Sequence, residues 1–116
     1  MHLPTPRPVA WIKAAKKDFQ GFPEGAQIEL ARALSIVADG GHPDIAKPLH
    51  GLGSGILEPA LRHRGDAFRV VYAVQIDDDV WVLHAFQKKS KSGIATPKAE
   101  IDLIAERLKR LEEAIR

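Results

Sequence analysis

The part of the sequence that most restricts the possible folds runs from Ile56 to Phe86, where three apolar segments follow one another with only short turns between them. Arg64-Gly65-Asp66 separates the first two segments and is a typical signal for a tight β-hairpin. Asp77-Asp78-Asp79 separates the last two. The segment from Val80 to Phe86 is apolar on both faces, as expected of a strand inside a sheet. These features predict a three-stranded antiparallel meander.

The first two strands of this meander each have two different faces, because side chains alternate along a strand. Over residues 56–64, one face carries Leu57, Leu61 and His63, and the other carries Glu58, Ala60, Arg62 and Arg64. Over residues 68–76, one face carries Phe68, Val70, Tyr72, Val74 and Ile76, and the other carries Arg69, Val71, Ala73 and Gln75. Pro59 cannot donate a hydrogen bond to a neighbouring strand, so a bulge or irregularity is predicted there.

Helical patterns flank the meander on both sides. Residues 9–12 predict a short edge strand, residues 13–19 a short helix and residues 23–39 a second helix. Residues 42–55 are rich in glycine and proline and predict a loop. Thr96 is a suitable N-cap and Pro97 a suitable first helical residue, and apolar residues then keep helical spacing to the end of the chain.

The chain is therefore expected to form one α+β domain over residues 1–116, with an extended lead-in over residues 1–8. Two helices precede the meander and one follows it. We expect the helices to pack on one face of the sheet, which leaves the other face free for Arg62, Arg64 and Arg69.

Composition excludes several classes of function. There is no cysteine, and therefore no disulfide framework, thiolate nucleophile or zinc–thiolate site. No apolar stretch approaches the length of a membrane span, and the first residues lack the hydrophobic region of a signal peptide, so we expect a cytoplasmic protein without a membrane partner. The five histidines have no metal-binding spacing, and the glycine-rich residues 51–55 lack the lysine and helix of a nucleotide loop. No metal or other cofactor is expected.

Three arginines are concentrated on the first two strands of the meander, although the net charge is only +2. Arg62, Arg64 and Arg69 flank a tight turn, close enough to act on one anion, and the planar donors of arginine match phosphate. Alternatively, they are solvated residues beside a turn. Arg69 lies within an apolar strand and needs an anionic partner, which could be Glu58 or Asp66 of the chain itself.

Lysines follow the last strand of the meander directly. No acid lies between His84 and Lys98, and this stretch contains Lys88, Lys89 and Lys91. The lysines form either a solubilising loop that also protects the sheet edge, or a phosphate-binding face together with the arginines. His84 is either a buried core residue or, if it faces this surface, a proton-transfer group.

Several motifs resemble the phage-derived Gp49-like proteins, which belong to the HigB branch of the RelE/ParE toxin superfamily. The most specific are the motifs Phe68-Arg69-Val70-Val71-Tyr72 and Leu83-His84-Ala85-Phe86-Gln87-Lys88-Lys89-Ser90. Weaker likenesses lie at Lys17-Asp18-Phe19 with Phe22-Pro23, at residues 46–53 and at residues 93–97. The resemblance covers nearly the whole chain, from about Val9 to the end.

The resemblance implies a curved antiparallel sheet in a RelE-like microbial ribonuclease fold. It implies the toxin of a type II toxin–antitoxin pair that cuts mRNA on the ribosome, without a metal, and that binds a helix-turn-helix antitoxin. Carried over by position, the catalytic basic residues are Arg69, Arg62 and either Lys88 or Lys89, with Arg64 and Lys91 left as RNA-binding residues. Some relatives have a catalytic tyrosine near the C-terminus. The only tyrosine here is Tyr72, on the expected core face, so the general base is open between His84 and Lys89.

Two other functions are compatible with the same resemblance. The ParE branch of the superfamily poisons gyrase and does not cut RNA, and a shared fold does not separate the two activities. A decayed phage remnant would bind only an antitoxin or nucleic acid.

Overall fold

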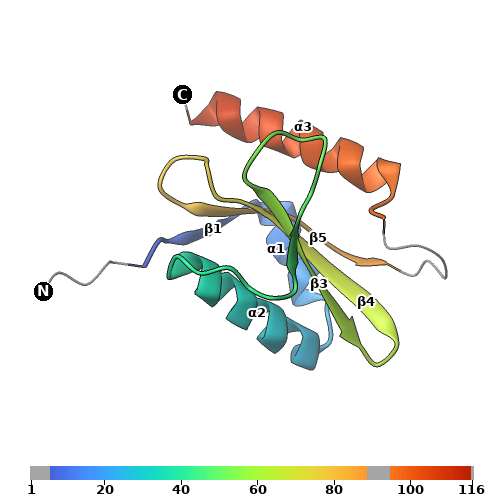
Figure 1. The fold of residues 1–116 in the computed structure, drawn as a ribbon. Coiled ribbons are helices and arrows are strands. Elements are labelled where there is room, and N and C mark those ends of the chain that lie inside the picture. Colours follow the sequence, from blue (N-terminus) through green and yellow to red (C-terminus); the bar gives the residue numbers. More distant parts are fainter. Residues whose placement is uncertain (1–5, 89–94, 116) are drawn as a thin grey trace, which may run out of the picture.

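The computed structural model of the protein describes residues 6–88 and 95–115 and is built around a five-stranded sheet (Figure 1). The strands lie in the order β1-β5-β4-β3-β2. The elements in chain order are β1 (Val9–Trp11), α1 (Lys13–Gln20), α2 (Glu24–Ala38), β2 (Ala46–Pro48), β3 (Ile56–His63), β4 (Asp66–Ala73), β5 (Val80–Lys88) and α3 (Lys98–Ala114). The predicted α+β class, with two N-terminal helices and a C-terminal helix, is confirmed.

The predicted antiparallel meander is also confirmed, as β3, β4 and β5. Arg64 and Gly65 form the two-residue turn between β3 and β4, and both have positive φ angles, 52° and 87°. This is the geometry that joins twisted strands most easily. The predicted edge strand is β1, and it pairs with β5 in parallel. Residues 46–48, predicted as part of a loop, instead form β2 on the opposite edge, antiparallel to β3.

Both faces of the sheet are covered, which corrects the expectation of one free face. On one face, α1 and α2 bury Phe19, Leu30 and Leu34 against β4 residues such as Val70 and Tyr72. On the other face, α3 buries Ile104 and Leu111 against Val71, Ala73 and Leu83. We call these the α1/α2 face and the α3 face. Helix α3 covers the second face because its apolar stripe has to be removed from water.

The irregularity predicted at Pro59 lies elsewhere. The register between β3 and β4 is the same on both sides of Pro59, from Leu57 opposite Tyr72 to Ala60 opposite Arg69. The shift instead lies between β4 and β5, where Val71 pairs with His84 but Tyr72 pairs with Val82. Leu83 is therefore an extra residue in β5, and the strand has a β-bulge there.

The bulge changes which face the second half of β5 presents. Val80 and Val82 pack into the core of the α1/α2 face. With strict alternation, residue 84 would follow them onto that face. Because Leu83 is an extra residue, His84 instead lies beside Val71 and contacts α3. Lys88, four residues later, lies on the α3 face as well.

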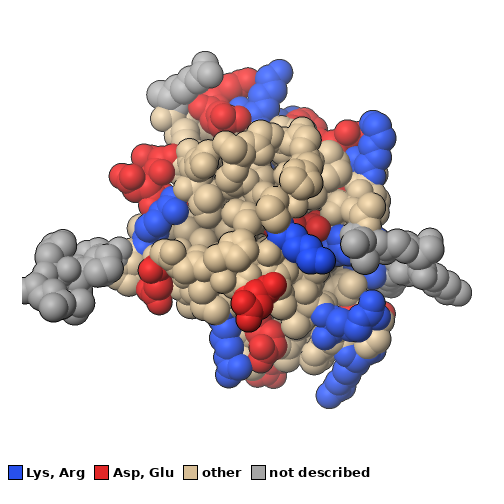
Figure 2. Space-filling model, viewed as in Figure 1, with Lys and Arg blue, Asp and Glu red and all other residues tan. Residues whose placement is uncertain are grey.

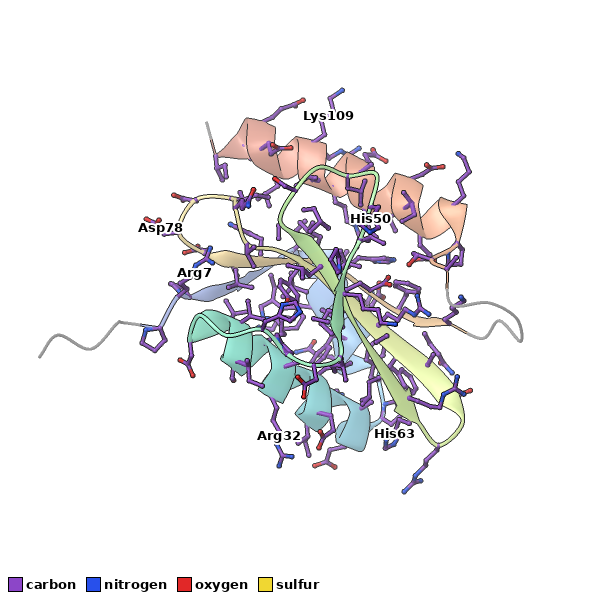
Figure 3. All side chains as sticks on the ribbon, viewed as in Figure 1. Arg7, Arg32, His50, His63, Asp78 and Lys109 are labelled. Atoms are coloured by element: carbon purple, nitrogen blue, oxygen red, sulfur yellow. The ribbon has the colours of Figure 1, made fainter. Side chains whose placement is uncertain are left out.

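The start of α3 also differs from the expected cap. The helix begins at Lys98, with Pro97 at the N-cap position and no side-chain hydrogen bond to the first turn. Thr96, the predicted N-cap, bonds to β3. The segment before β1 is held by Arg7, which donates to the carbonyl oxygens of Val74, Asp78 and Asp79 (Figure 3).

None of the described helices is long and apolar enough to span a membrane. Figure 2 shows acidic and basic side chains mixed around a largely uncharged centre, with Lys and Arg also lying near the end of the β3–β4 hairpin.

Candidate functional site

The α3 face of the sheet carries a compact set of charged residues. Ala60, Arg69 and Phe86 lie in one row across β3, β4 and β5, and Arg62, Ala67 and Lys88 lie in the next row. Adjacent strands are about 4.8 Å apart, so the side chains of one row are neighbours. The sheet register thus brings together three of the residues picked out in the sequence, Arg62, Arg69 and Lys88.

Arg69 is buried, with 6% of its surface exposed, and is paired with Glu58. Its Nη1 lies 3.1 Å from Glu58 Oε1 and donates a further hydrogen bond to Thr96 Oγ1 at 3.3 Å. Its Nε is also buried and makes no hydrogen bond among the described residues. A buried donor without a partner is costly, so Arg69 is held in place by its ion pair with Glu58 and not by a full set of hydrogen bonds.

Glu58 lies at the centre of the site. Its carboxylate accepts from Arg69 and from the hydroxyl of Thr96, at 2.8 Å to Oε2 and 3.0 Å to Oε1. The carboxylate is also buried, with 9% of the side chain exposed. Thr96 therefore closes the site over the ion pair from the end of the segment that leads into α3. This contact explains why Thr96 does not cap the helix.

Lys88 is buried next to this pair, not in a solvated loop. Its exposed fraction is 8%, and its Nζ donates to the carbonyl oxygen of Ala95 at 2.5 Å. Burial lowers the pKa of Lys88, and the nearby Arg69 guanidinium lowers it further, while Glu58 acts in the opposite direction. A lysine whose pKa is lowered gives up a proton more readily than an exposed one.

His84 belongs to a second polar group, which fastens α3 to the sheet. Its Nδ1 accepts from Arg107 Nη1 at 3.0 Å, so its proton lies on Nε2, which donates to Glu100. Arg107 also donates to the carbonyl oxygen of Leu83 at 3.0 Å. The ring stacks on Phe86 with centroids 5.0 Å apart. Both nitrogens of His84 are thus engaged by α3.

Arg62 is exposed, although its row neighbours that of Arg69. The other sequence candidates are less closely placed, and Arg64 is exposed in the turn at the hairpin end of the sheet. Lys89 and Lys91 lie outside the described residues. Tyr72 lies on the α1/α2 face, where burial raises its pKa to about 12. Within residues 6–88 and 95–115, no group of three or more His, Asp or Glu side chains is placed to hold a metal ion. His50 and His63 lie in separate parts of the molecule (Figure 3).

Four residues of this region were not assigned to the site from the sequence: Glu58, Thr96, Glu100 and Arg107. For Glu58 a signal existed, because it shares a strand face with Arg62 and was a possible partner of Arg69. Thr96 gave a misleading signal, since its position before a proline is also that of a helix cap. For Glu100 and Arg107 the sequence carries no signal of this kind, because charged residues of a terminal helix are usually solvated.

Comparison with known proteins gives a family and a fold. A family model described as "Phage derived protein Gp49-like (DUF891)" matches residues 17–109. A solved structure of the E. coli toxin RelE, free and with two arginines replaced by alanine, aligns with a TM-score of 0.62 and 19% identity, over 91% of this chain and 98% of that one.

A toxin–antitoxin complex, RelBE2 from Mycobacterium tuberculosis, aligns with a TM-score of 0.51 and 17% identity, over 73% of this chain and 94% of that one. These likenesses show a RelE-like fold. Comparison with curated protein sequences gives no significant match.

Proposed function

The chain belongs to the phage-derived Gp49-like family, and from this membership and its RelE-like fold we propose that it is the toxin of a toxin–antitoxin pair, an endoribonuclease that cuts mRNA on the ribosome. The observation that carries the proposal is the juxtaposition of Arg69, Lys88 and Glu58 on one sheet face, with Arg62 in the adjacent row. Such an activity would be exerted in the cytoplasm, where ribosomes are found.

These side chains suit a reaction in which the ribose 2′-hydroxyl attacks the adjacent phosphate. The reaction needs in-line positioning, compensation of the negative charge that develops on the phosphate, a proton acceptor and a proton donor. Arg69 and Arg62 supply positive charge. Lys88, with its lowered pKa, is suited to donate a proton to the leaving oxygen.

Glu58 is the proton acceptor that this geometry favours. The two candidates from the sequence are less suitable, because both nitrogens of His84 are engaged by α3 and Lys89 lies outside the described residues. The Glu58 carboxylate lies directly beside the proposed phosphate-binding cations. It accepts from the Thr96 hydroxyl in this structure, and a substrate 2′-hydroxyl would take the place of that donor.

The test is induction of the chain in cells, followed by measurement of growth and mapping of mRNA ends. We expect growth arrest and cut mRNA for the native chain. Removal of one charge that stabilises a transition state lowers rates by about 10²–10³-fold, so Arg62→Ala and Arg69→Ala should relieve toxicity. Arg32→Ala is the matched control. Arg32 is 71% exposed, and its helix, α2, packs on the opposite face of the sheet from the proposed site.

The outcomes distinguish the three candidate functions, provided that circular dichroism shows the variants to be folded. If Arg62→Ala and Arg69→Ala stay fully toxic at equal expression, the proposed site is wrong. Intact mRNA together with DNA-damage signalling would favour a gyrase-directed toxin. No growth defect in the native chain would favour an inactive remnant.

We also propose that a helix-turn-helix antitoxin, encoded beside this chain, is its partner. The RelBE2 structure is a toxin–antitoxin complex and supports the proposal at the level of fold. Co-expression of the neighbouring reading frame should restore growth and co-purify with the chain. If no small helix-turn-helix gene lies next to this one, the pairing is not supported.

A further inference from the structure

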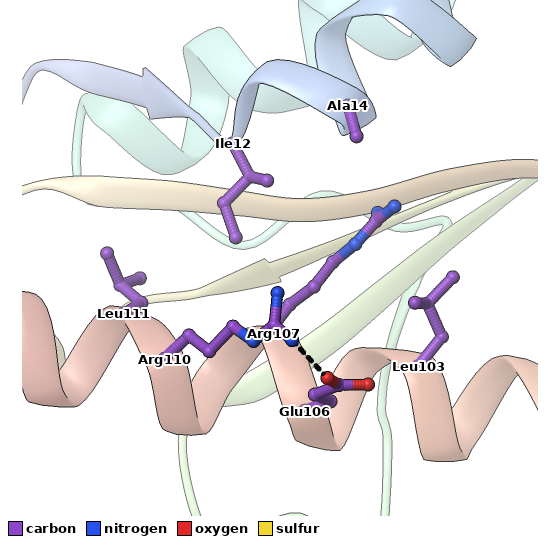
Figure 4. A pocket seen from close by; sticks show the side chains of 7 residues that line it. All are labelled: Ile12, Ala14, Leu103, Glu106, Arg107, Arg110 and Leu111. Atoms are coloured by element: carbon purple, nitrogen blue, oxygen red, sulfur yellow. Dashed lines mark hydrogen bonds and ion pairs between the residues drawn. The ribbon is translucent and has the colours of Figure 1, made fainter.

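A groove lies between the start of α1 and the C-terminal half of α3. Its volume is about 480 Å³, and it is lined by Ile12, Ala14, Leu103, Glu106, Arg107, Arg110 and Leu111. Figure 4 shows Ile12 and Ala14 on one side, facing Leu103 and Leu111 of α3 on the other. The groove forms where β1 ends and the chain turns into α1, so that helices on opposite faces of the sheet meet at its edge.

A second, shallower hollow continues from this groove along α1. It shares Ala14 with the first and is lined by Lys13, Lys16, Lys17 and Gln20, with a volume of about 690 Å³. All three lysines are exposed. The combined surface therefore has an apolar floor at one end and a row of lysines at the other.

The charges of this surface do not cancel. Arg110 is paired with Glu106 at 2.6 Å, and Arg107 donates to the Leu83 carbonyl and to His84. Asp18 is the one acid on α1. Within the described part of the chain, no ion pair is recorded for Lys13, Lys16 or Lys17. The lysine row thus has positive charge available to a partner.

We infer that this surface binds an acidic amphipathic helix of a protein partner. The apolar side chains of such a helix would cover Ile12, Leu103 and Leu111, and its carboxylates would lie against Lys13, Lys16 and Lys17. Grooves with apolar floors take helices that present anchors at positions i, i+3, i+4 and i+7. RNA phosphates would use the lysines but would leave the apolar floor uncovered. This surface is separate from the proposed RNA site and does not depend on it.

The test uses the full chain and three fluorescent probes, with binding followed by anisotropy. The first probe is a helical peptide with leucines at i, i+4, i+7 and i+11 and glutamates on the other face. The second has the same composition in scrambled order, and the third is a single-stranded oligouridine of similar charge. We expect the patterned peptide to bind at least about tenfold more tightly than the scrambled one, a difference of about 1.4 kcal/mol.

Variants locate the binding surface. Lys13→Glu combined with Lys17→Glu should weaken patterned-peptide binding by about tenfold, because two attractive contacts with the peptide carboxylates become repulsive. Lys109→Glu is the matched control, since Lys109 points away from the sheet in Figure 3 and should leave binding unchanged. Equal binding of the two peptides, no effect of the double variant, or tighter binding of oligouridine at the same lysines would each overturn the inference.

Discussion

Arg69 and Glu58 form a buried ion pair whose two partners depend on each other. Their side chains expose 7% and 9% of their surface, and Thr96 adds hydrogen bonds to both. A buried pair of this kind contributes little net stability compared with apolar residues of the same size, because both charges have to leave water. Its geometry places a guanidinium and a carboxylate side by side, which is an arrangement suited to chemistry on a phosphate.

Removal of only one partner should therefore be costly. In Glu58→Ala the Arg69 guanidinium stays buried without its carboxylate, and we expect the free energy of unfolding to fall by about 3–5 kcal/mol. Chemical denaturation measures the loss. The control replaces both partners, Glu58→Leu with Arg69→Met, and should lose clearly less than the single variant. A single variant as stable as the native chain would show that the pair is open to solvent.

Tyr72 allows a direct test of burial, because it is the only tyrosine in the chain. Burial raises its pKa from 10.0 to about 12. The native protein should therefore show little tyrosinate absorbance at pH 11, whereas the chain in denaturant ionises near its ordinary pKa. The sign for stability follows: the contribution of Tyr72 is present below pH 10 and is lost as pH rises towards 12. Half-ionisation of the folded protein near pH 10 would contradict the buried position.

At the scale of elements, α3 is fastened to the sheet by polar contacts as well as by its apolar stripe. Arg107 reaches the Leu83 carbonyl and His84 from the middle of the helix, and Glu100 contacts the other side of the same imidazole. Arg107 lies between the buried anchors Ile104 and Leu111, and Glu100 lies between Ile104 and the start of the helix. They determine how firmly α3 covers the site.

Loss of the Arg107 contacts should loosen α3 without unfolding the sheet. We expect Arg107→Met to lower stability by about 1–3 kcal/mol, because the Leu83 carbonyl and His84 lose a charged donor. Hydrogen exchange should become faster in the α3 amides than in those of β4. Arg110→Met is the matched control: its ion pair is 77% exposed on the arginine side, so it should cost no more than about 1 kcal/mol. Equal effects of the two variants would argue against the anchor.

The elements themselves could be predicted because their signals are local. The turn at Arg64-Gly65, the alternation in β4 and the stripe of α3 each follow from nearby residues. β2 could not be predicted, because its three residues, Ala46-Lys47-Pro48, are too few to show an alternation and include a proline, so their strand conformation follows from pairing with β3. The cover of α3 over the second sheet face, and the burial of Lys88, are set by packing between segments that are distant in the chain.

At the scale of the whole molecule, two apolar clusters lie on opposite faces of one sheet. Trp11 packs against the cluster of the α1/α2 face and Trp81 against the cluster of the α3 face. Ile12 contacts both clusters. Because β4 and β5 contribute side chains to each, we propose that the two clusters unfold together, as in a single domain.

The two tryptophans can report on the two clusters separately. In Trp11→Phe all tryptophan fluorescence comes from Trp81, and in Trp81→Phe it comes from Trp11, since the chain has two tryptophans. Within each variant, we expect the fluorescence transition in denaturant to coincide with the loss of circular dichroism. If the fluorescence and circular dichroism midpoints separate in either variant, the two faces unfold independently.

The bulge at Leu83 also changes how the sequence of β5 is divided between the two faces of the sheet. Side chains alternate between the faces along a strand, so one extra residue exchanges the faces of the odd-numbered and even-numbered positions that follow it. Before Leu83, the even-numbered residues Val80 and Val82 face α1 and α2; after it, the even-numbered residues His84 and Lys88 lie on the α3 face. A single-residue deletion there would keep both polar side chains in the sequence and yet turn them away from the α3 face. In this strand the number of residues before His84 and Lys88, as well as their chemistry, decides whether they can take part in the polar contacts of the α3 face.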